Sequence, residues 1–143
     1  MDNLSNVIKD IIKQSVRIVA RNFKKILHAP DDKVEHLTPN EEALKKALQQ
    51  CRKEIKKCKR WKVMPSKKCF EHAAMLSRQA KNYQKEIAIC QLYISLVDEC
   101  LSRRTFNKKK VERKAHLLCK PLIERILIAK NLNKNSGVEV SFL

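Results

Sequence analysis

The amino-acid sequence predicts an all-α protein, a single antiparallel bundle of four or five helices with one long central helix and a kinked last helix. Three observations lead to this fold class. Apolar residues recur every three or four positions through most of the 143 residues, which is the period of one helical face. One glycine and four prolines leave few positions that would break a helix. The longest strand-like alternation is the segment VEVSF at residues 138–142, so no sheet is expected.

The first helix is expected over residues 4–27. Its apolar positions form one face at helical spacing: Leu4, Val7, Ile8, Ile11, Ile12, Val16, Val19, Phe23, Ile26 and Leu27. The segment HAPDDKVEHL, residues 28–37, then interrupts the pattern with Pro30 and several acidic residues. A connection is therefore expected between the first helix and the second.

The second helix begins with the sequence TPNE, residues 38–41. Thr38 suits the N-cap, Pro39 the first helical position, and Glu41 completes a capping box. The apolar positions that follow alternate steps of four and three residues, which predicts a buried seam: Leu44, Leu48, Cys51, Ile55 and Cys58. Pro65 ends this helix, and Ser66 can cap the next one.

The third helix is expected to run without a break through residues 66–104, where no glycine or proline occurs after Pro65. Its seam keeps the same spacing throughout: Cys69, Ala73, Leu76, Ala80, Tyr83, Ile87, Cys90, Ile94, Val97 and Leu101. Small and polar residues in AKNYQ, residues 80–84, weaken the seam and make a break there the alternative. Toward the C-terminal half the apolar face widens, which predicts the buried centre of the bundle.

The segment RRTFNKKK, residues 103–110, predicts the next turn, with Thr105 or Asn107 as the helix cap. The last helix follows with a seam at Val111, Ala115, Leu118, Leu122, Ile126 and Ala129. Pro121 lies inside this pattern and predicts a kink. The helical domain is expected to cover residues 1–130, and residues 131–143 a flexible C-terminal tail.

The net charge of +17 is the strongest feature of the composition. A chain this basic attracts polyanions such as nucleic acid, anionic lipid or acidic protein. The longest apolar run, residues 87–97, is too short for a transmembrane segment. The N-terminus lacks a secretory signal pattern. A cytoplasmic protein is expected, with a nuclear or peripheral membrane location as alternatives, and its six cysteines are expected to be thiols.

Sequence motifs for catalysis are absent, and no enzyme activity and no cofactor are expected. One glycine excludes the glycine-rich phosphate loops, and the chain contains no HExxH, CxxC, GxSxG or DxD pattern. One arrangement has the spacing of metal ligands: Cys69 and His72, with His116 and Cys119, would supply a tetrahedral zinc site if the two pairs faced each other. The favoured interpretation is that no metal binds, because cysteine occupies seam positions elsewhere in this chain as a small apolar residue.

Two basic runs carry 14 of the 17 net charges: residues 52–68 sum to +8 and residues 103–114 to +6. They are the candidate polyanion-binding residues, named here as Arg52, Lys53, Lys56, Lys57, Lys59, Arg60, Trp61, Lys62, Lys67, Lys68, Arg103, Arg104, Lys108, Lys109 and Lys110. A continuous helix of about 36 residues between them would hold the two runs roughly 50 Å apart. The sequence therefore predicts two separate basic poles, unless the chain folds back near residue 81.

The composition leaves the identity of the polyanion open. Anionic phospholipid is slightly favoured, because Trp61 suits a membrane interface. RNA binding, as in a ribonucleoprotein assembly factor, is the alternative, although only seven aromatic residues supply base stacking. A helical scaffold for an acidic protein partner would carry the same charge. Part of the charge is also expected on any solvated helix face.

Two stretches resemble the tumour necrosis factor alpha-induced protein 8 family. They are VIKDIIKQSVRIVA, residues 7–20, and CQLYISLVDECLSRR, residues 90–104, which KKKVERKAHLL follows at 108–118. The segment LTPNEEALKKAL, residues 37–48, is loosely similar to the region between them in that family. The resemblance covers about half of the chain and lacks the family's leading segment. It implies a helical cylinder around a lipid cavity, phosphoinositide binding and non-catalytic signalling in apoptosis or inflammation. Lys9, Lys13 and Arg17 would then be the headgroup-binding residues.

Overall fold

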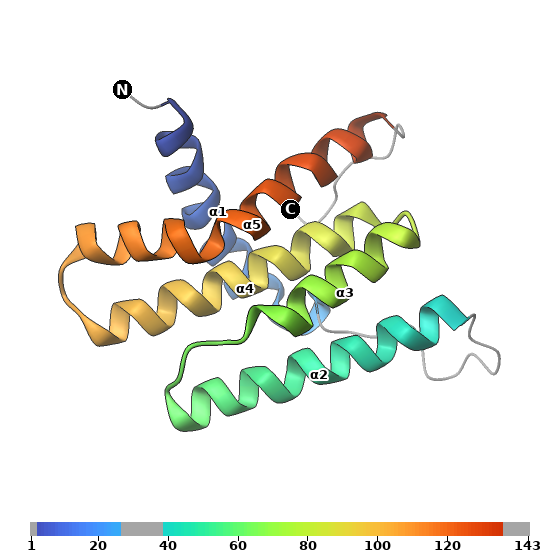
Figure 1. Ribbon diagram of the computed structural model, residues 1–143, viewed down its shortest axis with the longest axis horizontal. Helices are drawn as coiled ribbons and strands as arrows, with labels where there is room; N and C mark the ends of the chain where they lie inside the picture. The colour runs from blue at the N-terminus through green and yellow to red at the C-terminus, as the bar shows by residue number, and fades with distance from the viewer. Residues whose placement is uncertain (1–2, 27–38, 136–143) are drawn as a thin grey trace.

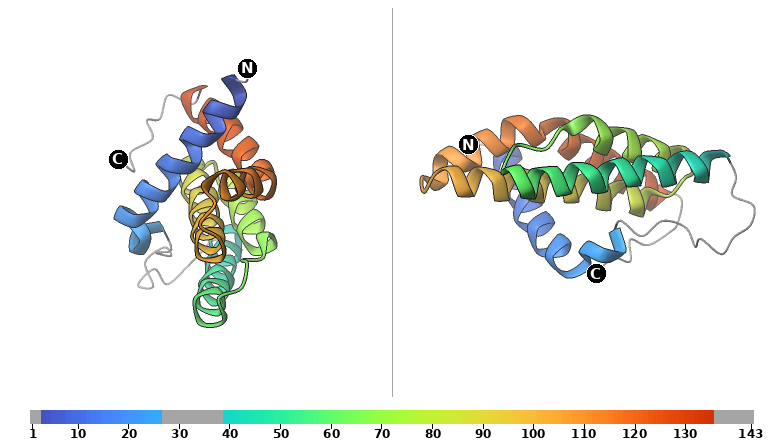
Figure 2. Two further views of the ribbon diagram at one scale, coloured as in Figure 1. Left: turned by 90° about the vertical axis from the view of Figure 1, so that its left-hand side faces the viewer. Right: turned by 90° about the horizontal axis from the view of Figure 1, so that it is seen from below.

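The computed structural model describes residues 3–26 and 39–135, which form five α-helices (Figure 1). The helices are α1 (Asn3–Ile26), α2 (Pro39–Trp61), α3 (Lys67–Gln79), α4 (Tyr83–Arg104) and α5 (Lys108–Asn135). Helices α2, α3 and α4 run alongside one another in alternating directions, and α1 crosses them obliquely (Figure 2). The described residues contain no strand. The all-α bundle predicted from the sequence is confirmed.

Helix α4 is the central element, because it packs against α1, α3 and α5. Residues 86–94 of α4 are all buried, as the widening of its apolar face predicted. Phe70 of α3 and Tyr93 of α4 pack with their ring centroids 5.5 Å apart. Such aromatic packing contributes beyond the area it buries. Most of the hydrophobic core therefore lies around this one helix.

Helix α2 packs against α3 through the seam that the sequence predicted. Its buried residues are Leu44, Ala47, Leu48, Cys51, Ile55 and Cys58. The helix begins at Pro39, as expected, whereas the predicted N-cap Thr38 lies outside the described residues. At its other end Lys62 has a positive φ of 54°, the left-handed conformation that ends a helix.

The prediction of one continuous helix over residues 66–104 is wrong. The chain reverses at Ala80–Asn82, between α3 and α4. Lys81 adopts φ 57°, and two hydrogen bonds close the turn: Lys81 N–H donates to the Arg78 carbonyl and Asn82 N–H to the Ser77 carbonyl, each at 2.8 Å. These two bonds define a Schellman motif. The Asn82 side chain then accepts a hydrogen bond from Lys85 N–H at 3.1 Å and caps α4.

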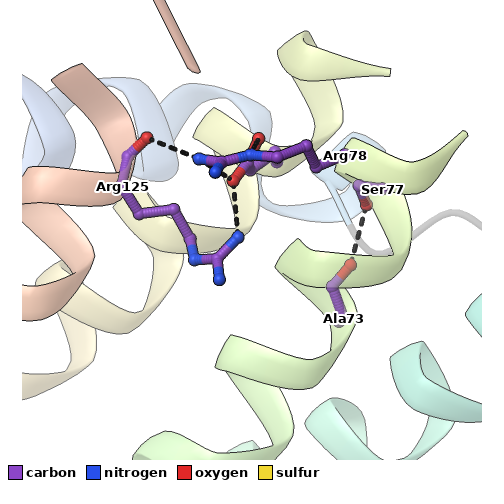
Figure 3. A network of polar contacts seen from close by, with 5 residues as sticks. Ala73, Ser77, Arg78 and Arg125 are labelled. Carbon is purple, nitrogen blue, oxygen red and sulfur yellow. Dashed lines mark hydrogen bonds and ion pairs between the residues drawn. The ribbon is translucent and has the colours of Figure 1, made fainter. Parts of the chain in front are cut away.

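A buried carboxylate holds this helical hairpin and α5 together (Figure 3). Glu86 of α4 is completely buried, and Arg78 Nη2 and Arg125 Nη1 each lie 2.7 Å from its Oε2 atom. Arg78 Nε donates to Glu86 Oε1 at 2.9 Å, and Arg78 Nη2 donates to the Arg125 carbonyl at 3.4 Å. One acidic side chain thus connects three helices next to the chain reversal.

Helix α5 changes direction near its middle, where Pro121 lies, so the predicted kink is confirmed (Figure 1). Asn107 caps this helix by accepting a hydrogen bond from Lys110 N–H at 3.3 Å. Cys119 is buried in place of the predicted Leu118, which is 38% exposed. The tail predicted for residues 131–143 needs correction as well, because α5 continues to Asn135 and Asn133 is buried. Residues 136–143 lie outside the described part of the chain.

Replacing Glu86 with glutamine should destabilise the fold by about 2–3 kcal/mol. Removing one partner of a buried ion pair typically costs about 3–5 kcal/mol, and the partial exposure of Arg78 and Arg125 lowers this figure. Denaturant unfolding measures the loss. Glu99→Gln on the same helix is the matched control, because the exposed Glu99–Arg103 pair should contribute less than about 1 kcal/mol. Equal losses in the two variants would contradict the role given to Glu86.

The chain reversal predicts a short distance between Lys62 and Arg104. Spin labels introduced at these positions through unnatural amino acids should lie well within the roughly 50 Å that a continuous helix would impose. Pulsed electron paramagnetic resonance measures this distance directly. A distribution centred near the longer value would show that α3 and α4 form one helix in solution.

Candidate polyanion-binding surface

The chain reversal brings the two basic runs to the same end of the bundle. Helices α2 and α4 end there and α5 begins there, whereas α3 begins further back, beside residues 51–54 of α2 (Figure 1). Lys59 and Lys62 from the first run line one pocket with Arg103 and Arg104 from the second. The prediction of two basic poles roughly 50 Å apart is therefore wrong.

We call this region the basic end. It comprises the exposed cations of three helix termini: Lys59, Arg60, Lys62, Arg103, Arg104, Lys108, Lys109 and Lys110. Arg52, Lys53, Lys56 and Lys57 are also exposed, but they lie further back along α2. Lys67 and Lys68 are exposed at the start of α3, which lies beside residues 51–54 of α2. The candidate cations of the sequence thus divide into one cluster at the end of the bundle and a flank formed by α2 and the start of α3.

The pocket at the basic end has a volume of about 160 Å³. Cys58, Val63, Leu96 and Cys100 supply apolar surface to it. Glu99 is the one acidic residue among its lining residues, and its carboxylate is ion-paired with Arg103 one helical turn away. Cations thus line a pocket that also offers apolar surface, which suits an amphiphilic anion.

Helix dipoles account for only part of this charge. Lys59, Arg60, Arg103 and Arg104 lie in the last turns of α2 and α4, where cations are stabilised. In contrast, Lys67 and Lys68 begin α3 and residues 108–110 begin α5, and the first turns of both helices lack acidic residues. A cation at a helix N-terminus is destabilising by a few tenths of a kcal/mol to about 1 kcal/mol. Lys67 Nζ lies 3.6 Å from Glu71 Oε1 in the same helix, which offsets this cost, whereas the helix dipole gives no stabilisation to residues 108–110.

Glu54, the one acidic residue in residues 52–68, has a structural role. Its Oε2 atom accepts a hydrogen bond from the Ser66 backbone N–H at 2.7 Å and lies 3.6 Å from the Cys58 thiol. This contact satisfies an N–H group at the start of α3. Burial and Glu54 together raise the pKa of Cys58 to about 11, so this thiol stays protonated at neutral pH.

Two aromatic side chains project from the basic end. Trp61, the last residue of α2, is 64% exposed, and Phe106, between α4 and α5, is fully exposed. The guanidinium carbon of Arg60 lies 5.2 Å from the Trp61 ring centroid, a distance typical of a cation–π contact. Trp61 was among the binding residues predicted from the sequence and Phe106 was not, although Phe106 lies within the second basic run.

The residues selected by the family resemblance lie partly together. Lys9 and Lys13 of α1 line a cavity of about 300 Å³ with Lys109, Arg113 and His116 of α5. Two acidic residues, Asp98 and Glu112, also line it, and Lys9 Nζ lies 3.4 Å from Glu112 Oε2. Burial raises the pKa of Asp98. Arg17 is exposed elsewhere on α1 and does not line this cavity.

The four residues with zinc-ligand spacing do not form a metal site. Among the residues that the structure describes, no group of three or more histidine, cysteine, aspartate or glutamate side chains could hold a metal ion. Cys119 is fully buried on α5, whereas His72 is exposed on α3. Cys69 and His72 belong to α3, which packs against α2 and α4, whereas His116 and Cys119 belong to α5.

All six cysteines are free thiols, and five of them are buried. Burial of Cys51, Cys58, Cys90 and Cys100 confirms their predicted positions in the core. The Cys51 thiol lies 3.5 Å from the carbonyl oxygen of Cys69. Hydrogen bonding with the Cys51 thiol lowers the pKa of Cys69 and raises that of Cys51.

Comparisons with protein-family models, curated proteins and solved structures returned no match to this chain. The resemblance of residues 7–20 and 90–104 to the tumour necrosis factor alpha-induced protein 8 family therefore remains an expectation from those motifs alone. Within residues 3–26 and 39–135, no helix combines the length and hydrophobicity needed to cross a membrane.

Cys69 should react with a thiol reagent faster than the other five cysteines. It is only half-buried, and its lowered pKa increases the thiolate fraction at neutral pH. Labelling of the native protein, followed by peptide mass spectrometry, measures each rate. In the Cys69→Ser variant, the fastest of the labelling reactions should disappear. Equally fast labelling of Cys51 and Cys90 in the native state would contradict the burial of these thiols.

Proposed function

We propose that this protein is non-catalytic and docks on anionic phospholipid surfaces through its basic end. The observation that carries the proposal is the convergence of Lys59 and Lys62 with Arg103 and Arg104 around one pocket. Cations near an anionic membrane contribute about 1 kcal/mol each, and a cluster of four to eight is typical of phospholipid binding. Phosphoinositides, with several phosphates on one headgroup, are the preferred lipids.

The shape of the surface supports a membrane over RNA. The cations that line the pocket and those that begin α5 belong to three helix termini at one end of the bundle, and the exposed cations of α2 continue from there along one flank (Figure 1). A lipid bilayer presents many headgroups in one plane, so an end of this kind reaches several at once. RNA attracts the same charge through counterion release, and an acidic protein attracts it as well. These alternative partners are outcomes of the tests below.

A peripheral position on a cytoplasmic membrane face follows from this proposal, because anionic lipids are concentrated there. The family resemblance adds a signalling context in apoptosis or inflammation. No catalytic step is part of the proposal, because the sequence lacks glycine-rich phosphate loops and the HExxH, CxxC, GxSxG and DxD motifs.

Replacing Lys59, Lys62, Arg103 and Arg104 with glutamine should weaken binding to phosphoinositide vesicles by up to about 1,000-fold at low salt. Four cations at about 1 kcal/mol each account for this limit. Vesicle co-sedimentation at several salt concentrations measures both the affinity and its salt dependence, and both should fall. The four side chains are exposed, so these substitutions should leave the stability of the fold nearly unchanged.

The matched control removes four charges away from the basic end, by replacing Lys46, Lys120, Lys130 and Lys134 with glutamine. All four lysines are exposed, and they lie on α2 and α5 outside the basic end. This variant should lose much less affinity than the first. Equal losses would show that net charge alone drives binding. Unchanged vesicle binding in both variants, with lost RNA binding in the first, would assign the basic end to RNA.

A further inference from the structure

Among the aromatic side chains that the structure describes, the exposed ones lie at the basic end. The structure describes the side chains of five aromatic residues: Trp61, Phe70, Tyr83, Tyr93 and Phe106. Phe70 and Tyr93 are buried and Tyr83 is half-buried, whereas Trp61 and Phe106 are exposed. Both exposed residues thus lie beside the converging cations, Trp61 as the last residue of α2 and Phe106 in the connection between α4 and α5.

The α4–α5 connection holds Phe106 outward. Thr105 Oγ1 accepts a hydrogen bond from Asn107 N–H at 3.2 Å, and Asn107 Oδ1 accepts one from Lys110 N–H at 3.3 Å. The turn is therefore fixed on both sides of Phe106, while the phenyl ring itself is fully exposed. The bundle does not need this ring for packing.

Basic residues flank each exposed aromatic residue in the sequence. Lys59, Arg60 and Lys62 flank Trp61, and Arg103, Arg104 and Lys108 flank Phe106. Long basic side chains keep their charge at the level of lipid phosphates while their stems and a neighbouring aromatic ring lie deeper. Tryptophan in particular favours the region between headgroups and acyl chains.

We propose that the bundle docks end-on, with Trp61 and Phe106 inserted into the boundary between the headgroups and acyl chains of an anionic bilayer. This inference rests on the proposed function and deepens it, because it adds two apolar anchors to the electrostatic contact. Binding then has two components. The cations confer salt-sensitive attraction, and the two rings confer attachment that persists at moderate salt.

Trp61 is the only tryptophan of the chain, so its fluorescence reports on this surface without labelling. With phosphatidylcholine vesicles that contain phosphatidylserine, its emission should shift to shorter wavelength, and lipids carrying a quencher on the upper acyl chain should quench it. Pure phosphatidylcholine vesicles should give little change. Sedimentation with the same anionic vesicles at moderate salt measures attachment.

Phe106→Ser and Trp61→Ser should each reduce attachment at moderate salt at least about tenfold, as expected for the loss of one buried aromatic ring. Their binding at low salt should change much less, because every cation remains. Leu117→Ser is the matched control, since Leu117 is an exposed apolar residue of α5, 71% exposed, away from the basic end. It should leave both measurements unchanged.

The outcomes separate the two proposals. Salt-reversible vesicle binding without an emission shift or acyl-chain quenching would overturn insertion and leave electrostatic docking intact. No binding to anionic vesicles at low salt would overturn the proposed function itself. Quenching of Trp61 by single-stranded polyuridylate, with no response to vesicles, would overturn both in favour of base stacking by RNA.

Discussion

The ionic contact of Glu86 with Arg78 and Arg125 is the constraint on which the arrangement of the helices depends. A fully buried carboxylate is costly unless cations and hydrogen-bond donors compensate it. Arg78 lies just before the chain reversal and Glu86 just after it, so their contact closes the α3–α4 hairpin. Arg125 attaches α5 to the same carboxylate. Any arrangement that opened the hairpin would leave Glu86 buried without its partners or expose the core around it.

The geometry of the opposite end follows from that hairpin. Because α3 and α4 run in opposite directions, the end of α4 returns to the side where α2 ends. Lys59 of α2 and Arg103 of α4 consequently line the same pocket, although they are far apart in sequence. Like charges at this proximity repel one another and destabilise the folded state. The ionic contact at one end of the bundle fixes the opposite directions of α3 and α4, and these directions bring the cations together at the other end.

Periodicity alone predicted the helices and their buried faces, because burial of an apolar stripe decides both. The seam of α2 and the central position of α4 are examples. The chain reversal was only the alternative prediction, because its left-handed position is occupied by Lys81, where glycine would have been the recognisable signal. The only other indication was the weak apolar stripe in residues 80–84. Glu86 gave no signal either, since an acidic residue in the first turn of a helix is usually exposed.

The candidate site could be predicted as a set of residues but not as a surface. Its cations are visible in the sequence as two runs, whereas their proximity depends on the single turn at Lys81 and Asn82. The same turn brings Phe106 to the end of the bundle where Trp61 lies. In the sequence Phe106 is one of seven aromatic residues, and in the fold it is one of two exposed aromatic rings at the basic end. The ion pairs of Glu86 lie on α3, α4 and α5 beside the reversal, apart from the pocket-lining cations. Stability and polyanion docking therefore depend on different side chains, and substitutions at the basic end test binding without removing the contact that holds the hairpin closed.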